Sequence, residues 1–107
     1  MSDDADAGVS DPVELGRIRD EIDKIDREVV RLLAQRGQWV TRAAGLKRDE
    51  VAVRGPARRV EQVVTKARAH AEEFGLEPEV AERTYRALVA AFIDAEQRAH
   101  GVLRNGV

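Results

Sequence analysis

Arg36 is the residue whose position points most directly to chemistry. Around it, apolar residues recur every three or four positions, as on one face of a helix: Leu15, Ile18, Ile22, Ile25, Val29, Leu32, Trp39, Ala43 and Leu46. The one missing step in this pattern is position 36. Burying a guanidinium without a partner is strongly destabilising, so Arg36 needs a structural carboxylate or an anionic ligand. We interpret Arg36 as a ligand-binding residue.

Two further cations are predicted to lie near Arg36. Lys47 follows it by eleven residues, and on a continuous helix this spacing leaves the two about 20° apart in direction and about 16 Å apart along the axis. Arg59 opens a second helical pattern and lies four residues before the apolar Val63. The planar fork of an arginine suits both oxygens of a carboxylate. A site lined by these three cations would need either an anionic ligand or structural carboxylates.

The composition excludes several kinds of catalysis and of partner. The sequence of 107 residues has no cysteine, its only serines are Ser2 and Ser10, and its only histidines are His70 and His100. Any reaction must therefore proceed without a Ser or Cys nucleophile, and a thiolate metal site is excluded. With 18 basic and 20 acidic residues, the net charge of -2 argues against binding to nucleic acid or to an anionic membrane.

A long first helix is expected to carry Arg36. Either Ser10 or Asp11 would be the N-cap, and Pro12 would take the first helical position. The pattern continues without a breaker to about Lys47 or Arg48. Gly37 and Gly45 within it are expected only to lower the helix propensity.

Two shorter helices are expected to follow, over residues 56–74 and from 78 to about 100. Pro56 and Pro78 suit first turns, and Gly75 suits the C-cap between them. The absence of any strand pattern makes the fold class all-α. The residues expected to be buried are Val60, Val63, Val64, Ala67 and Ala71 in the second helix, and Ala81, Tyr85, Leu88, Phe92 and Ala95 in the third.

The unequal helix lengths predict an intertwined homodimer. We expect a disordered leader over 1–10 and a single helical domain over 11–107, whose first helix exposes more apolar surface than the other two can cover. A lone three-helix bundle is the alternative. Trp39 is expected in the core or the dimer interface. Cysteine is absent and no apolar run approaches the ~20 residues of a membrane span, so a cytoplasmic location is expected.

Arg19 is predicted to act across this dimer. It precedes Arg36 by seventeen residues and points about 100° away from it on a helix. It therefore cannot easily reach the same ligand within one subunit. An antiparallel partner helix could bring it there.

Several segments together resemble one enzyme family. The first helix contains "IRDEIDKIDREVVRLLAQR", "RR" opens the second helix, and "YRALVAAFIDAEQ" lies in the third. Over about residues 13–100 the chain is similar to the all-helical AroQ class (type II) of chorismate mutases. The resemblance implies an intertwined homodimer that rearranges chorismate, a small dicarboxylate, to prephenate without a metal or a cofactor.

The resemblance also implies a role for each matching residue. Arg36 and Arg19, which would reach the partner's site, would bind substrate carboxylates, and Arg59 would assist. Lys47 would donate to the ether oxygen, and Glu96 would face the same oxygen. A loop shifted by one residue would replace Arg59 by Arg58, and Gln97 is the alternative to Glu96. A carboxylate would repel the developing negative charge, so Glu96 would assist only when protonated.

The sequence departs from this family at two positions. Pro56 and Val60 stand where the family usually has an acidic loop residue and a Glu that hold the substrate hydroxyl. This makes the chain similar also to isochorismate pyruvate lyases and to mutases of 4-amino-4-deoxychorismate. A non-catalytic helical dimer module is the alternative from another class. The sequence does not identify a larger synthase partner.

Overall fold

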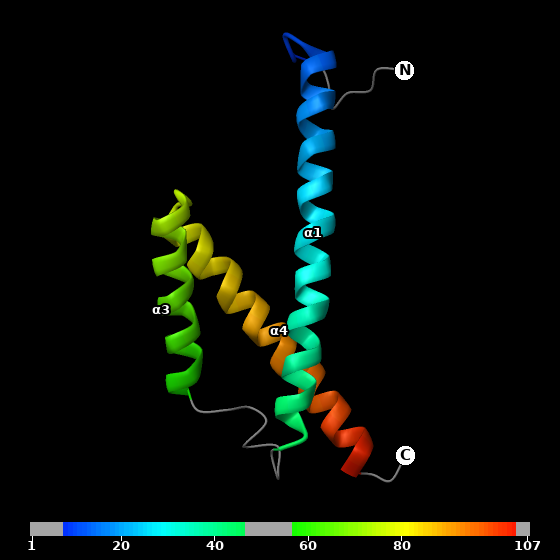
Figure 1. The fold of residues 1–107 in the computed structure, drawn as a ribbon, viewed down its shortest axis with the longest axis vertical. Helices are drawn as coiled ribbons and strands as arrows, with labels where there is room; N and C mark the ends of the chain where they lie inside the picture. The colour runs from blue at the N-terminus through cyan, green and yellow to red at the C-terminus, as the bar shows by residue number, and fades with distance from the viewer. Residues whose placement is uncertain (1–7, 47–56, 105–107) are drawn as a thin grey trace. The chain divides into compact units, whose positions relative to one another are not determined.

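The computed structural model describes residues 8–46 and 57–104, the last five of them by their backbone alone. Its helices are α1 (Pro12–Ala44), α3 (Ala57–Phe74) and α4 (Pro78–Arg104) (Figure 1). Within these two stretches there is no strand. The predicted all-α fold with three helices and a long first helix is confirmed.

The chain divides into two compact units between Arg36 and Gly37, inside α1. The first unit holds most of α1. The second holds the last turns of α1 together with α3 and α4.

The first helix begins at the cap that its sequence specifies. Asp11 Oδ1 accepts a hydrogen bond of 3.0 Å from the backbone N–H of Glu14. The carbonyl of Asp11 accepts one of 3.0 Å from the N–H of Leu15. These two bonds define an N-cap. Of the two predicted candidates, Ser10 and Asp11, the cap is therefore Asp11.

The prediction that the first helix reaches Lys47 or Arg48 is wrong. The α-helix ends at Ala44, and Gly45 and Leu46 form a turn. The N–H of Leu46 donates to Ala43 O, three residues back, at 3.0 Å, which is the tighter pattern common at helix ends. Glycine's low helix propensity favours the stop at Gly45.

The turn between α3 and α4 follows from Gly75. This residue has φ +76°, and the N–H of Leu76 donates to Ala71 O at 2.8 Å. A glycine in the left-handed region with this bond is a Schellman cap, as the sequence predicts. Pro78 then begins α4.

Small residues form the core between α3 and α4. Ala67, Ala71 and Ala81 are buried in one cluster, and Tyr85 packs against it. Alanines at the contact let two helix backbones approach closely. The buried residues also include Val64 in α3 and Val89 in α4.

The buried face of α4 differs in part from the predicted one. Ala95, predicted inside, is exposed, whereas Val89 and Glu96 are buried. Val60 and Val63, both predicted inside α3, are half-buried. The sequence of α4 allows two adjacent rows of residues as the buried face. In the structure the buried row is the one that contains Val89 and Glu96.

Charged pairs join α3 to α4 beside this core. Arg86 of α4 donates from Nη1 and Nη2 to the two carboxylate oxygens of Glu61 in α3, at 2.8 and 3.0 Å. Arg68 of α3 donates to Glu82 of α4 at 2.8 Å, and Arg86 Nε donates to the same carboxylate at 3.0 Å. The hydrogen bonds from Arg86 hold the pKa of Glu61 and of Glu82 below the ordinary value of 4.5. Both carboxylates are thereby stabilised in the charged form.

None of the residues of α1 is buried. Its apolar side chains remain substantially exposed, among them Ile18, Ile22, Ile25, Val29 and Leu32. Ion pairs such as Lys24–Glu21 at 2.8 Å and Arg31–Glu28 at 2.9 Å run along the helix surface. In the described part of the chain, no helix is both long and apolar enough to cross a membrane.

Candidate active site

The two predicted cations of the first unit, Arg19 and Arg36, both lie on α1. Arg36 is half-buried and Arg19 is exposed. Their seventeen-residue separation amounts to about 26 Å along the helix axis. One small dicarboxylate cannot span that distance. Arg19 and Arg36 of the same chain therefore cannot bind the same molecule.

The structure describes only two of the other three predicted residues, Arg59 and Glu96. Lys47 lies outside the described residues. Arg58 and Arg59 are both exposed in the first turn of α3, so exposure does not choose between them. Glu96 lies on α4. Both α4 and α3, which carries Arg59, belong to the second unit.

Glu96 is the more enclosed of the two candidates on α4. It is 8% exposed, whereas the neighbouring Gln97 is half-buried. Few acidic side chains are buried to this extent, because the charged form is costly away from water. The burial of Glu96 favours it over Gln97 as the residue that faces the interior.

A close contact that the sequence did not predict lies one helical turn before Glu96. A Cβ placed on Gly37 of α1 would be 3.2 Å from Cε1 of Phe92 in α4. The aromatic ring therefore lies against the helix backbone at Gly37. The only sequence signal is a glycine inside a helical pattern, which by itself indicates no more than a loss of helix propensity.

Trp39 does not belong to the core of the single chain, so that part of its prediction is wrong. It is 64% exposed, and the guanidinium carbon of Arg42 lies 4.7 Å from the centre of its ring. This is a cation–π contact along the helix surface. A place in a dimer interface remains a prediction.

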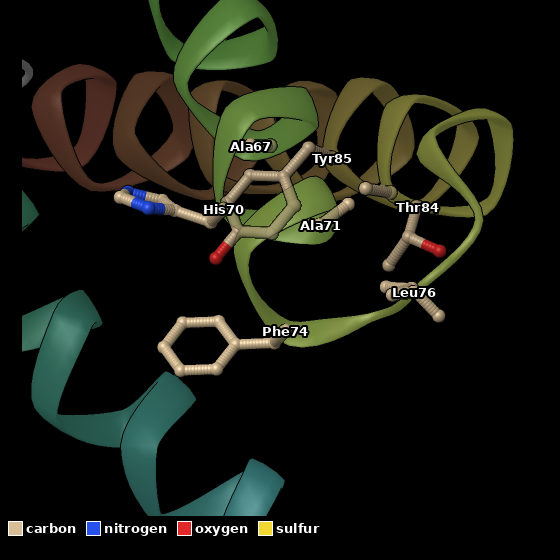
Figure 2. A pocket seen from close by; sticks show the side chains of 8 residues that line it. Ala67, His70, Ala71, Phe74, Leu76, Thr84 and Tyr85 are labelled. Carbon is tan, nitrogen blue, oxygen red and sulfur yellow. The ribbon is translucent and has the colours of Figure 1, made fainter.

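A hollow between α3 and α4 differs in character from the predicted site. Its volume is about 220 Å³, and Figure 2 shows the rings of Tyr85 and Phe74 and the imidazole of His70 around it. The lining is mainly apolar and includes no lysine, arginine or carboxylate: Ala67, His70, Ala71, Phe74, Leu76, Ala81, Thr84 and Tyr85. A dicarboxylate would lose its hydration there without gaining a strong cationic partner. The hollow is not the dicarboxylate site.

The described structure defines an all-α protein with cations on its long first helix and a buried carboxyl on its last. Residues 18–97 match the family model described as chorismate mutase type II, which covers most of the chain. The chain belongs to the chorismate mutase type II family. A search of curated proteins finds no significant match. Arg19, Arg36, Lys47, Arg59 and Glu96 all fall inside the matched segment. Family membership supports an activity of the chorismate mutase type, an isomerisation.

Proposed function

We propose that the protein is a chorismate mutase that converts chorismate to prephenate, in aromatic amino acid or secondary metabolism. The observation that carries the proposal is Arg36, a half-buried cation on the apolar face of α1 within the family-matched segment. The reaction suits a chain without cysteine and with serines only at positions 2 and 10. It needs no nucleophile, because one C–O bond breaks as one C–C bond forms within the same molecule.

Catalysis would consist of positioning and charge stabilisation. Arg36 and Arg19 of the other chain would bind the two carboxylates and hold the substrate side chain folded over its ring, and Arg59 would assist. Lys47 would donate a hydrogen bond to the ether oxygen, where negative charge gathers as the C–O bond breaks. Protonated Glu96 would be the second donor to that oxygen. The burial of Glu96 supports this role over Gln97.

The active form would be an intertwined homodimer of one domain per chain, over residues 11–107. The exposed apolar face of α1 supports this, because Ile18, Ile22 and Ile25 are each about half exposed or more in the single chain. Arg19 and Arg36 are also too far apart on one helix to serve one ligand. Arg19 of one chain would therefore complete the site of the other.

A substrate panel tests the proposal. Purified protein is incubated separately with chorismate, isochorismate and 4-amino-4-deoxychorismate, and chorismate loss is followed by ultraviolet absorbance. Pyruvate release is measured in parallel. Chorismate loss with formation of prephenate and no pyruvate is the expected result. Absence of turnover with all three substrates would reject an enzymatic function.

Two other reactions remain as alternatives because of Pro56 and Val60. These residues replace the polar contacts that the family usually makes to the substrate hydroxyl. Pyruvate from isochorismate would identify a lyase. Preferential turnover of the 4-amino substrate would identify a 4-amino-4-deoxychorismate mutase. Each outcome has its own product, so one panel separates the three activities.

A further inference from the structure

Gly37 differs in its surroundings from Gly16, also in α1, and from Gly45 in the turn that follows α1. A Cβ at Gly37 would meet Phe92 Cε1 at 3.2 Å and Cζ at 3.8 Å. A Cβ at Gly16 would meet nothing within 4 Å, and one at Gly45 would meet only carbonyl oxygens of its own helix turn, at ordinary contact distances. The missing side chain at position 37 therefore has a packing consequence, because it allows an aromatic ring to lie directly on the helix backbone.

The two sides of this contact each adjoin a predicted site residue. Arg36 is bonded to Gly37 within the continuous helix α1. Glu96 follows Phe92 by four residues on α4, and residues at that spacing share one face of a helix. Helices transmit small displacements as nearly rigid bodies, so a shift at the contact moves the backbone from which each side chain extends.

We infer that Gly37 is a positioning residue, whose lack of a side chain sets the distance between the helix backbone at Gly37 and the stretch of α4 that carries Phe92 and Glu96. This inference rests on the proposed function. A methyl group at position 37 must displace the Phe92 ring or the backbone by a few tenths of an ångström. A 1 Å misplacement can lower an enzymatic rate by about a hundredfold, so the smaller shift is expected to lower kcat by about tenfold.

The test compares Gly37→Ala with Gly16→Ala in the same helix. Alanine has a higher helix propensity than glycine, so both substitutions are expected to stabilise the helix locally. Only the Cβ added at position 37 would contact Phe92. We expect Gly16→Ala to raise the thermal midpoint and leave kcat and KM unchanged. For Gly37→Ala we expect a smaller rise in the midpoint of thermal unfolding than for Gly16→Ala, or a fall. Its kcat is expected to fall about tenfold, with a smaller change in KM.

Rescue by a smaller side chain separates positioning from general damage. Phe92→Leu in the Gly37→Ala background frees space at the contact and is expected to restore most of kcat. The single Phe92→Leu variant completes the double-mutant cycle. If Gly37→Ala does not fold, the double variant takes its place, and recovered helical circular dichroism supports the contact. A double variant that remains unfolded or inactive overturns the inference.

The outcomes separate this inference from the proposed function. A wild-type protein inactive on all three substrates rejects the proposed function and, with it, the positioning role. An active wild type with Gly37→Ala kinetically equal to Gly16→Ala rejects the positioning role alone. A lowered kcat that Phe92→Leu restores supports both.

Discussion

Arg36 interrupts the apolar face of α1 with a permanent charge, and its substitution separates an enzyme from a helical module without activity. We predict that Arg36→Leu lowers kcat/KM by at least about a hundredfold, because the transition state loses a charged partner. In a helical dimer module without activity, the same change would only raise the midpoint of urea unfolding. Steady-state kinetics and urea unfolding on the same preparations measure both effects.

Arg31→Leu is the matched control for that substitution. Arg31 lies on the same helix, is exposed, and pairs with Glu28 at 2.9 Å along the surface. We expect its kinetics to remain those of the wild type. An equal loss of activity in both variants would remove the special role of Arg36.

Glu96 makes a second prediction at the scale of one residue. If its protonated form donates to the ether oxygen, kcat/KM rises as the pH falls. Glutamine donates without titrating, so Glu96→Gln is expected to flatten the profile while keeping substantial activity. Rates of both proteins over a pH series provide the measurement. A flat wild-type profile would instead favour Gln97 as the donor.

At the scale of elements, the ion pairs between α3 and α4 predict a loss of stability in acid. The pKa of Glu61 and of Glu82 lies below 4.5 in the folded chain, because Arg86 donates hydrogen bonds to both carboxylates. Over that pH range the unfolded chain binds more protons than the folded one. The stabilisation is therefore present above pH 4.5 and is lost as the pH falls through the lowered pKa values.

Arg86→Met tests the assignment of that loss. Methionine keeps an apolar stem but no charge, so the urea midpoint of the variant should fall less steeply in acid than that of the wild type. Arg83→Met is the control, because Arg83 pairs within α4 with Glu79 at 3.0 Å and does not join the two helices. Equal acid sensitivity in all three proteins would show that other carboxylates dominate. Protein concentration is held constant throughout.

At the scale of the whole molecule, the exposed apolar face of α1 predicts dimerisation. Ile25→Glu would bury an uncompensated charge in the proposed interface. It is expected to weaken association by about 3 kcal/mol or more, which exceeds a hundredfold in Kd. Val30→Glu is the control on the same helix, since Val30 is 64% exposed, similar to 61% for Ile25, and lies off the apolar stripe. Analytical ultracentrifugation gives both constants. A wild-type protein monomeric at all concentrations would contradict the prediction.

Mixing two inactive variants tests whether Arg19 acts in the partner's site. Chains with Arg19→Ala and chains with Arg36→Ala are unfolded together and refolded. In a mixed dimer, one site receives both wild-type arginines and the other receives neither. Random pairing in a two-fold dimer then restores about a quarter of wild-type activity. Each variant refolded alone should remain inactive, and a mixture that is equally inactive would contradict a site shared between the two chains.

Much of the local structure of this protein could be predicted from its sequence. The cap at Asp11, the positive φ at Gly75 and the start at Pro78 depend on a few neighbouring residues, so helix starts and the turn between α3 and α4 could be predicted. The resemblance to the family, which the family match supports, is enough to name five site residues from the sequence alone. Their roles remain predictions, and Lys47 lies outside the described residues.

The contacts between helices could not be predicted from the sequence alone. The choice of Val89 over Ala95, the pairing of Arg86 with Glu61 across two helices, and the contact of Phe92 with Gly37 each depend on how one helix is rotated and placed against another. Helical periodicity identifies a face only to within about one residue row. The tertiary structure selects the row, because side chains far apart in the chain must fill the same space without overlap.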